Sequence, residues 1–101
     1  MSHIYDFEWD ARKAFSNIKK HGISFEQAAQ VFLDPLSITV FDEAHSMNEE
    51  RWLTLGQNTN GDLLVVAHTY LQAKSSRSLV RIISARLASK QERRIYSDKQ
   101  I

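Results

Sequence analysis

The chain has 101 residues, of which 43% are apolar and 25% charged. This is the composition of one soluble globular domain, so we expect a single domain over residues 1–101. The sequence contains no cysteine, which excludes disulfide frameworks, thiolate nucleophiles and cysteine-ligated metals. No apolar run approaches the roughly 20 residues of a membrane-spanning helix. The first residues lack the pattern of a signal peptide, and we expect a cytoplasmic protein without membrane contact.

The formal net charge of +1 conceals a difference between the two halves of the chain. Residues 1–50 carry four Lys or Arg against nine Asp or Glu, whereas residues 51–101 carry nine against three. A basic half favours an anionic partner such as a nucleic acid. The alternative is that the two halves neutralise each other across the fold, and charge alone leaves both interpretations open.

The first third of the chain predicts a strand and two helices. Alternating aromatic residues indicate a strand over residues 4–9. Asp10 is suited to cap a helix over residues 11–20, and Gly22 is suited to the left-handed position that ends it. A second helix should start after Ser24 and end before the single proline of the chain.

The remainder of the chain predicts four strands and a final helix. The β-branched or apolar segments cover residues 36–41, 51–55, 63–70 and 79–83. Ser84 is expected to cap a helix over residues 85–96. The order β-α-α-β-β-β-β-α, with hairpin-like connections, predicts an α+β fold with a small, mostly antiparallel sheet. Residues 71–78 are interpreted as a long loop.

Several kinds of chemistry lack their sequence signatures. The four histidines are too widely spaced for a metal motif, and the segment from Asp42 to His45 is better explained as a solvated loop. With three glycines, the chain has no phosphate-binding glycine-rich loop, and no serine lies in a GxSxG motif. We therefore expect neither a metal nor another cofactor.

Basic and histidine side chains are compatible with RNA cleavage. The 2′-hydroxyl of RNA can attack the neighbouring phosphate, so an enzyme must position the strand, move protons and stabilise the added negative charge. Arginine stabilises phosphate charge through two parallel hydrogen bonds, and histidine or a perturbed lysine can transfer protons. The composition permits this mechanism without demonstrating it.

Short motifs follow one another in order over nearly the whole chain. They are Phe7-Glu8-Trp9-Asp10, Lys13, Asn17-Ile18-Lys19-Lys20-His21-Gly22, Phe25-Glu26-Gln27-Ala28, Phe32-Leu33-Asp34-Pro35, Glu50-Arg51 with Gly56, Arg81-Ile82-Ile83-Ser84-Ala85-Arg86, and Glu92-Arg93 with Tyr96. In this set the chain resembles the BrnT family of bacterial toxins. The resemblance implies a RelE-like fold and a toxin that cuts RNA without a metal. It also implies a BrnA-like ribbon-helix-helix antitoxin that carries the complex to operator DNA, commonly as a heterotetramer with two toxins.

Four residues are the candidates for the catalytic set. Lys20 would contact phosphate and His21 would transfer a proton, although cations at a helix C-terminus are also favoured by the helix dipole. Arg51 would bind phosphate or pair with Glu50. Arg86, in the first turn of the expected last helix, conflicts with the dipole there. We therefore expect Arg86 to bind an anion and Arg86→Ala to abolish toxicity.

Further cations are candidates for RNA binding, namely Arg81, Lys90, Arg93 and Arg94. Solvated positions on a strand edge or helix face explain them equally well. His68 lies in an apolar segment and is interpreted as a hydrogen-bonded core histidine rather than a catalytic one. Two other functions stay open at this point: a non-catalytic co-repressor that binds an antitoxin, and a generic RNA-binding module.

Overall fold

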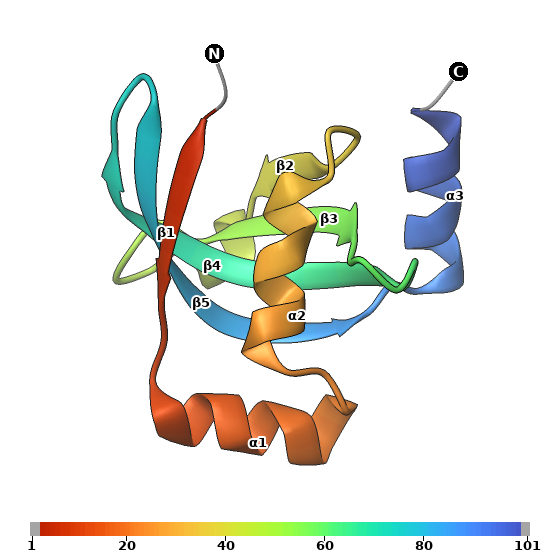
Figure 1. Ribbon diagram of the computed structural model, residues 1–101, viewed down its shortest axis with the longest axis horizontal. Coiled ribbons are helices and arrows are strands. Elements are labelled where there is room, and N and C mark those ends of the chain that lie inside the picture. The colour runs from red at the N-terminus through yellow and green to blue at the C-terminus, as the bar shows by residue number, and fades with distance from the viewer. Residues whose placement is uncertain (1–2, 100–101) are drawn as a thin grey trace.

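Five strands form one sheet in the order β1-β5-β4-β3-β2 in the computed structural model, which describes residues 3–99 (Figure 1). The strands are β1 (Ile4–Glu8), β2 (Ile38–Phe41), β3 (Trp52–Gln57), β4 (Leu63–Ala73) and β5 (Arg77–Leu87). The edge strand β1 runs parallel to β5, and every other neighbouring pair is antiparallel. The sheet is therefore mixed but mostly antiparallel, as predicted.

Three α-helices accompany the sheet among the described residues, and they are α1 (Ala11–His21), α2 (Phe25–Gln30) and α3 (Lys90–Asp98). Short 3-10 turns, η1 (Val31–Leu33) and η2 (Glu43–His45), follow α2 and β2. In Figure 1, α2 crosses one face of the sheet, α1 lies below it, and α3 stands beside the far end of the strands. The predicted α+β class and the order of its elements are confirmed.

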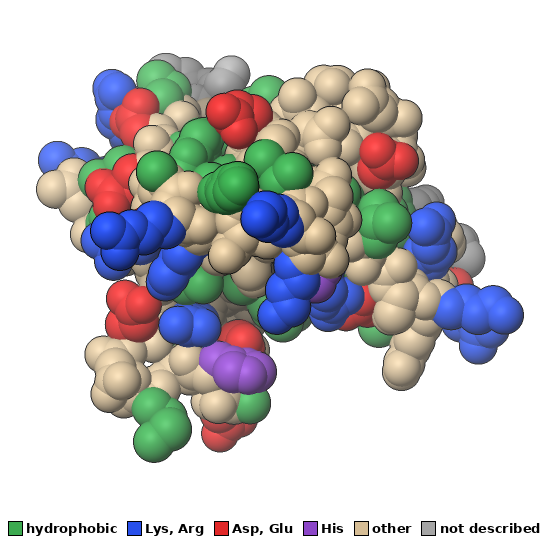
Figure 2. Space-filling model, turned by 90° about the horizontal axis from the view of Figure 1, so that it is seen from below, with side chains coloured by type: hydrophobic (Ala, Val, Ile, Leu, Met, Phe, Trp, Pro, Cys, Tyr) green, Lys and Arg blue, Asp and Glu red, His purple; other side chains and the backbone are tan. Residues whose placement is uncertain are grey.

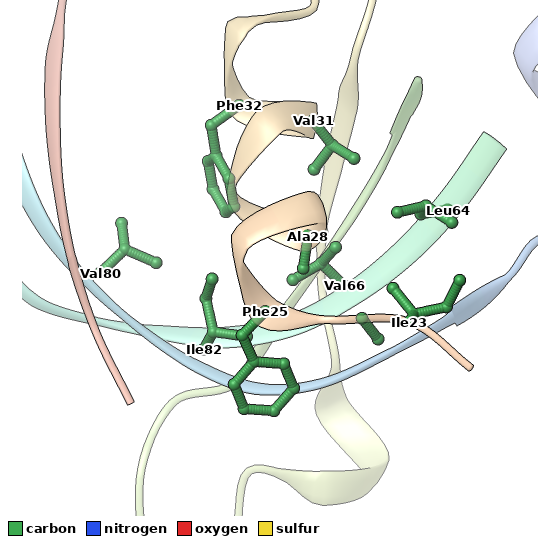
Figure 3. Packing of buried hydrophobic residues seen from close by; sticks show 10 residues of the cluster. Ile23, Phe25, Ala28, Val31, Phe32, Leu64, Val66, Val80 and Ile82 are labelled. Carbon is green, nitrogen blue, oxygen red and sulfur yellow. The ribbon is translucent and has the colours of Figure 1, made fainter. Parts of the chain in front are cut away.

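The main core lies between α2 with η1 and the facing side of the sheet (Figure 3). Phe25 and Ala28 are fully buried against Val66, Val80 and other apolar side chains of β4 and β5. The cluster buries the apolar side of α2, and a helix this short would not be stable without such packing. The same packing fixes the turn between α1 and α2, and hence the position of α1.

The opposite face of the sheet carries a smaller cluster under α3. Tyr96 is buried there with Leu55 and Val65. Its hydroxyl donates a 2.6 Å hydrogen bond to Asp34, whose other hydrogen bonds hold the backbone amides of Leu36 and Gln57. Asp34, which lies in the segment between η1 and β2, therefore links that segment to α3 and to the end of β3.

The C-terminal boundary between strand and helix was predicted too early. Strand β5 continues to Leu87, and α3 begins at Lys90 with Ser89, not Ser84, as its cap. The physical reason is the ladder with β4, which pairs Ser84 with Ala67 and extends beyond it. The backbone N–H and C=O groups of residues 84–87 find hydrogen-bond partners in β4, so these residues remain in a strand and do not form a helix.

The predicted long loop over residues 71–78 is also wrong. Strand β4 extends to Ala73 and β5 starts at Arg77, so the connection is a tight hairpin. The amide of Lys74 donates a 2.8 Å hydrogen bond to the carbonyl of Arg77 and closes the turn.

His68 is a fully buried core residue, as predicted. Its Nε2 atom is hydrogen-bonded to Thr54 Oγ1 at 2.7 Å, and Thr54 in turn shares a 2.8 Å hydrogen bond with Thr39. The ring packs edge-on against Phe32 and Tyr70. Desolvation in this environment lowers the pKa of His68 to about 4.

This buried histidine predicts a loss of stability in mild acid. Because the pKa is about 4 in the folded state and about 6.5 in the unfolded state, the unfolded chain binds the extra proton. Stability is complete above pH 6.5 and falls as the pH drops toward 4, by about 2 kcal/mol between pH 7 and pH 5. Urea unfolding at both pH values measures this difference. In His68→Gln the same interval should change stability far less, and an equal loss in both proteins would contradict the assignment.

Candidate functional site

A basic groove of about 480 Å³ lies between α1, β5 and the start of β3. Its lining residues are Arg12, Lys13, Ser16, Asn17, Lys20, His21, Arg51, Ile83 and Ser84. No Asp or Glu is among them. Seen from below, Lys and Arg side chains gather around a hollow on the face that carries α1 (Figure 2). The groove therefore combines positive charge with a concave surface, which suits an anionic ligand.

The local sequence fixes the position and length of α1. Asp10 accepts hydrogen bonds from the amides of Arg12 and Lys13, and Gly22 ends the helix with a φ of 72°. Between these caps, a spacing of three or four residues places the groove residues of α1 on one flank of the helix. The helix itself contains no acidic residue, so the charge of this flank is not neutralised from within α1.

Asn17 connects α1 to the rest of the groove. Its side chain is 5% exposed and makes three hydrogen bonds to backbone groups. The amide nitrogen donates to the carbonyls of Ile23 and Ala85 at 2.9 and 2.8 Å, and the side-chain oxygen accepts from the amide of Ala85 at 3.1 Å. One turn of α1 is thereby held against β5, which sets the width of the groove.

Arg51 is positioned by the closed base of the loop between β2 and β3. The amide of Asp42 donates to the carbonyl of Arg51 at 2.8 Å. The Ser46 hydroxyl accepts from the Arg51 amide at 2.9 Å and donates to the carbonyl of Asp42 at 2.6 Å. The backbone of Arg51 is therefore fixed at the base of this loop, and Arg51 lines the groove together with residues of α1.

The cations of the groove differ from several other arginines in their partners. Among residues 3–99, Arg77 pairs with Asp6 at 2.7 Å and Arg81 with Glu8 at 3.2 Å, both across the parallel β1–β5 edge. The two halves of the chain do neutralise each other at this edge. No ion pair within the described residues involves the four groove cations, Arg12, Lys13, Lys20 and Arg51. Their charge is available to a ligand.

The structure brings together three of the four predicted catalytic residues. Lys20 and His21, from the last turn of α1, and Arg51, from the start of β3, line the same groove although 30 residues separate them in sequence. Arg86 is not among the lining residues. Arg81 lies in an adjoining hollow of about 290 Å³, which shares Lys13 with the groove.

The remaining predicted RNA-binding residues lie apart from the groove. Lys90, Arg93 and Arg94 are exposed on α3, which Figure 1 shows away from α1. They form no ion pair among the described residues, which leaves solvation and nucleic-acid contact as alternatives. None of these three α3 residues lines the groove.

Arg86 forms an ion pair within the protein, which its predicted position in a helix did not suggest. It lies in β5 and forms a bidentate ion pair with Glu92 of α3. Its two terminal guanidinium nitrogens lie 2.7 and 2.9 Å from the two carboxylate oxygens. The hydrogen bond to Arg86 is the main reason that the pKa of Glu92 falls to about 2. The dipole argument for Arg86 was wrong, because α3 begins four residues after it.

We expect Arg86→Ala and Glu92→Gln to destabilise the protein by a similar amount, about 1 kcal/mol, because the pair is partly solvent-exposed. Glutamine keeps an oxygen for the Ser89 amide, which Glu92 holds at 2.8 Å. Urea unfolding measures both effects. RNA cleavage by Arg86→Ala should stay within about tenfold of wild type, and a loss as large as that of a groove variant would restore Arg86 to the catalytic set.

Four polar lining residues of α1 were not among the predicted site residues, namely Arg12, Lys13, Ser16 and Asn17. The available signal was their spacing. Positions 13, 16, 17 and 20 follow the helical repeat of three and four, which places them on one flank once Lys20 is chosen. The burial of Asn17 had no such signal, since it depends on β5.

Two negative observations concern the described residues. Within residues 3–99, no three side chains of His, Cys, Asp or Glu are grouped as a metal site. In the same part of the chain, no helix has the length and apolar character needed to cross a membrane.

The fold and the groove define a small α+β protein with a basic concave surface. Residues 9–92 match the family model described as the ribonuclease toxin BrnT of type II toxin–antitoxin systems, and the chain belongs to this family. The crystal structure of the Brucella abortus ribonuclease toxin BrnT has a similar fold, with a TM-score of 0.60 and 24% sequence identity. The match covers 86% of this chain and 99% of that one. No curated protein matches the chain in sequence.

Proposed function

We propose that this protein is a metal-independent endoribonuclease whose active site is the groove between α1 and Arg51. The observation that carries the proposal is the set of four groove cations that have no carboxylate partner within residues 3–99. Surface cations in proteins are usually solvated or paired singly, whereas a concave group of unpaired cations favours a phosphate backbone. Membership of a ribonuclease toxin family agrees with this ligand.

The proposed reaction uses the 2′-hydroxyl of the substrate as nucleophile. The hydroxyl loses its proton as it attacks the adjacent phosphorus, the bond from phosphorus to the 5′-oxygen breaks as the 2′,3′-cyclic phosphate forms, and the 5′-oxygen takes up a proton. Arg51 grips the phosphate oxygens from one side and Lys20 neutralises charge from the other, which lowers the energy of the transition state. His21, beside Lys20, transfers a proton. This mechanism is that of a RelE-like ribonuclease.

The proposal includes the regulation of the toxin. We assign it a BrnA-like ribbon-helix-helix antitoxin as partner, with contact to operator DNA made through the antitoxin. We also propose a heterotetramer with two copies of each protein, as the family resemblance implies. The site of action would be the bacterial cytoplasm, where RNA is the substrate.

Induced expression in bacteria tests the function, with growth and total RNA integrity as readouts. We expect growth arrest and RNA breakdown with wild type, and neither with the double variant Lys20→Ala/Arg51→Ala at equal soluble expression. A living host supplies ribosomes, so cleavage that depends on them is detected. Growth and intact RNA with folded wild-type protein would contradict the nuclease and favour a co-repressor that only binds antitoxin. Arrest with intact RNA would also overturn it.

A further inference from the structure

The outer side of α1 carries an apolar surface that the fold leaves uncovered. Phe15 is 55% exposed and Ile18 is 51% exposed, and the two are neighbours one helical turn apart. Ala11, one turn before Phe15, is also exposed. Single exposed apolar residues are common, but a stripe along one helix is typical of a contact surface. None of these three residues lines the basic groove.

The outer stripe, defined as Ala11, Phe15 and Ile18, has a positively charged border. The ammonium group of Lys19 lies 4.9 Å from the centre of the Phe15 ring, and Arg12 follows on the groove side. The last turn of α1 is basic as well, and the helix has no acidic residue of its own. Asp10, before the helix, is engaged with two backbone amides. The surface is therefore apolar along its centre and cationic along its edge.

The apolar centre and cationic edge of the outer stripe favour some binding partners over others. A second copy of the same helix would bring like charges together, which is unfavourable. RNA would find a stacking surface in Phe15 but gains little from the aliphatic Ile18. An apolar protein segment flanked by carboxylates complements both properties, because its hydrophobic side chains cover the stripe while its charges face Lys19 and Arg12.

We propose that the outer stripe of α1 is the docking site for the antitoxin, and that the docking segment is apolar with adjoining Asp or Glu residues. Such a segment would run along α1 beside the groove that contains Lys20. Binding there would obstruct the path of RNA and attract its carboxylates to the groove cations. The consequence for cleavage rests on the proposed function, whereas the docking itself does not.

Binding of the purified cognate antitoxin, measured by calorimetry, tests the proposal. We expect Phe15→Ser/Ile18→Ser to weaken the complex by roughly 100-fold, since each anchor of an interface is worth more than 1 kcal/mol. Lys19→Glu should weaken it by roughly tenfold, with an effect that shrinks at high salt. The matched controls are Leu33→Ser, at a position that is 74% exposed, and Lys74→Glu in the β4–β5 turn. Both controls should bind like wild type.

The two claims fail in distinguishable ways. Wild-type affinity in folded Phe15→Ser/Ile18→Ser, or an equal loss in Leu33→Ser, would overturn the docking site. RNA breakdown by the free Phe15→Ser/Ile18→Ser variant should equal that of wild type and should resist the antitoxin. If wild-type toxin breaks down no RNA, the proposed function falls, while the affinity comparison still decides the docking site.

Discussion

Replacement of Arg51 by alanine is expected to slow RNA cleavage by about 10²–10³-fold, the effect of removing one strong donor from a developing charge. The reason is that Arg51 lines the same groove as Lys20 and has no carboxylate partner in the described residues. Its backbone is held by Ser46 and Asp42, so the change should leave the loop intact. The measurement is the initial rate of RNA loss after induction, at matched protein levels.

Two control variants separate the role of Arg51 in the groove from a general effect of losing an arginine. Arg51→Lys keeps the charge but loses the planar fork, so we expect an intermediate loss of cleavage. Arg77→Ala removes an arginine that is paired with Asp6 and lies outside the groove, and cleavage should be unchanged. An undiminished rate in folded Arg51→Ala, or an equal loss in Arg77→Ala, would remove Arg51 from the site.

Asn17→Ala is expected to cost about 3 kcal/mol of unfolding free energy. The change leaves one buried amide and two carbonyls without their partner, and each unsatisfied backbone group costs on the order of 1 kcal/mol or more. It also releases α1 from β5, so cleavage should fall even at temperatures where the variant remains folded. Urea unfolding measures the stability, and RNA loss at low temperature measures the activity.

Asn17→Asp provides the matched test of this clamp. The aspartate has nearly the same shape but cannot donate, so it places negative charge against the carbonyls of Ile23 and Ala85. We expect it to destabilise the protein at least as much as alanine does at pH 7. Ser16→Ala, at the neighbouring exposed position, should change stability by less than about 0.5 kcal/mol. Near-wild-type stability of both Asn17 variants would contradict the clamp.

Elements with local signals were predictable from the sequence. Helix α1 was correct because Asp10 and Gly22 act on the backbone next to them, and the sequence alone contains both. The end of β5 was missed because both Ser84 and Ser89 are good caps in isolation. The choice between them is made by β4, which pairs with residues 84–87 from a distant part of the chain.

The same distinction explains how much of the site was predictable. Lys20, His21 and Arg51 all fell in family motifs, but only the fold shows that one groove holds all three. The helical position predicted for Arg86 was wrong, because β5 continues past it and α3, which carries its partner Glu92, starts only at Lys90. The role of Asn17 depends on backbone atoms of β5, 68 residues away, which no local pattern reveals.

The chemical ends of the cut RNA distinguish attack by the 2′-hydroxyl from attack by water. After induction of the wild-type toxin, RNA is extracted and the termini at the new cleavage sites are determined. Attack by the 2′-hydroxyl in a groove of Arg, Lys and His side chains predicts a 2′,3′-cyclic phosphate, or its opened phosphate, on one fragment and a 5′-hydroxyl on the other. A 3′-hydroxyl with a 5′-phosphate would require water as the nucleophile and would contradict the mechanism assigned to Lys20, His21 and Arg51.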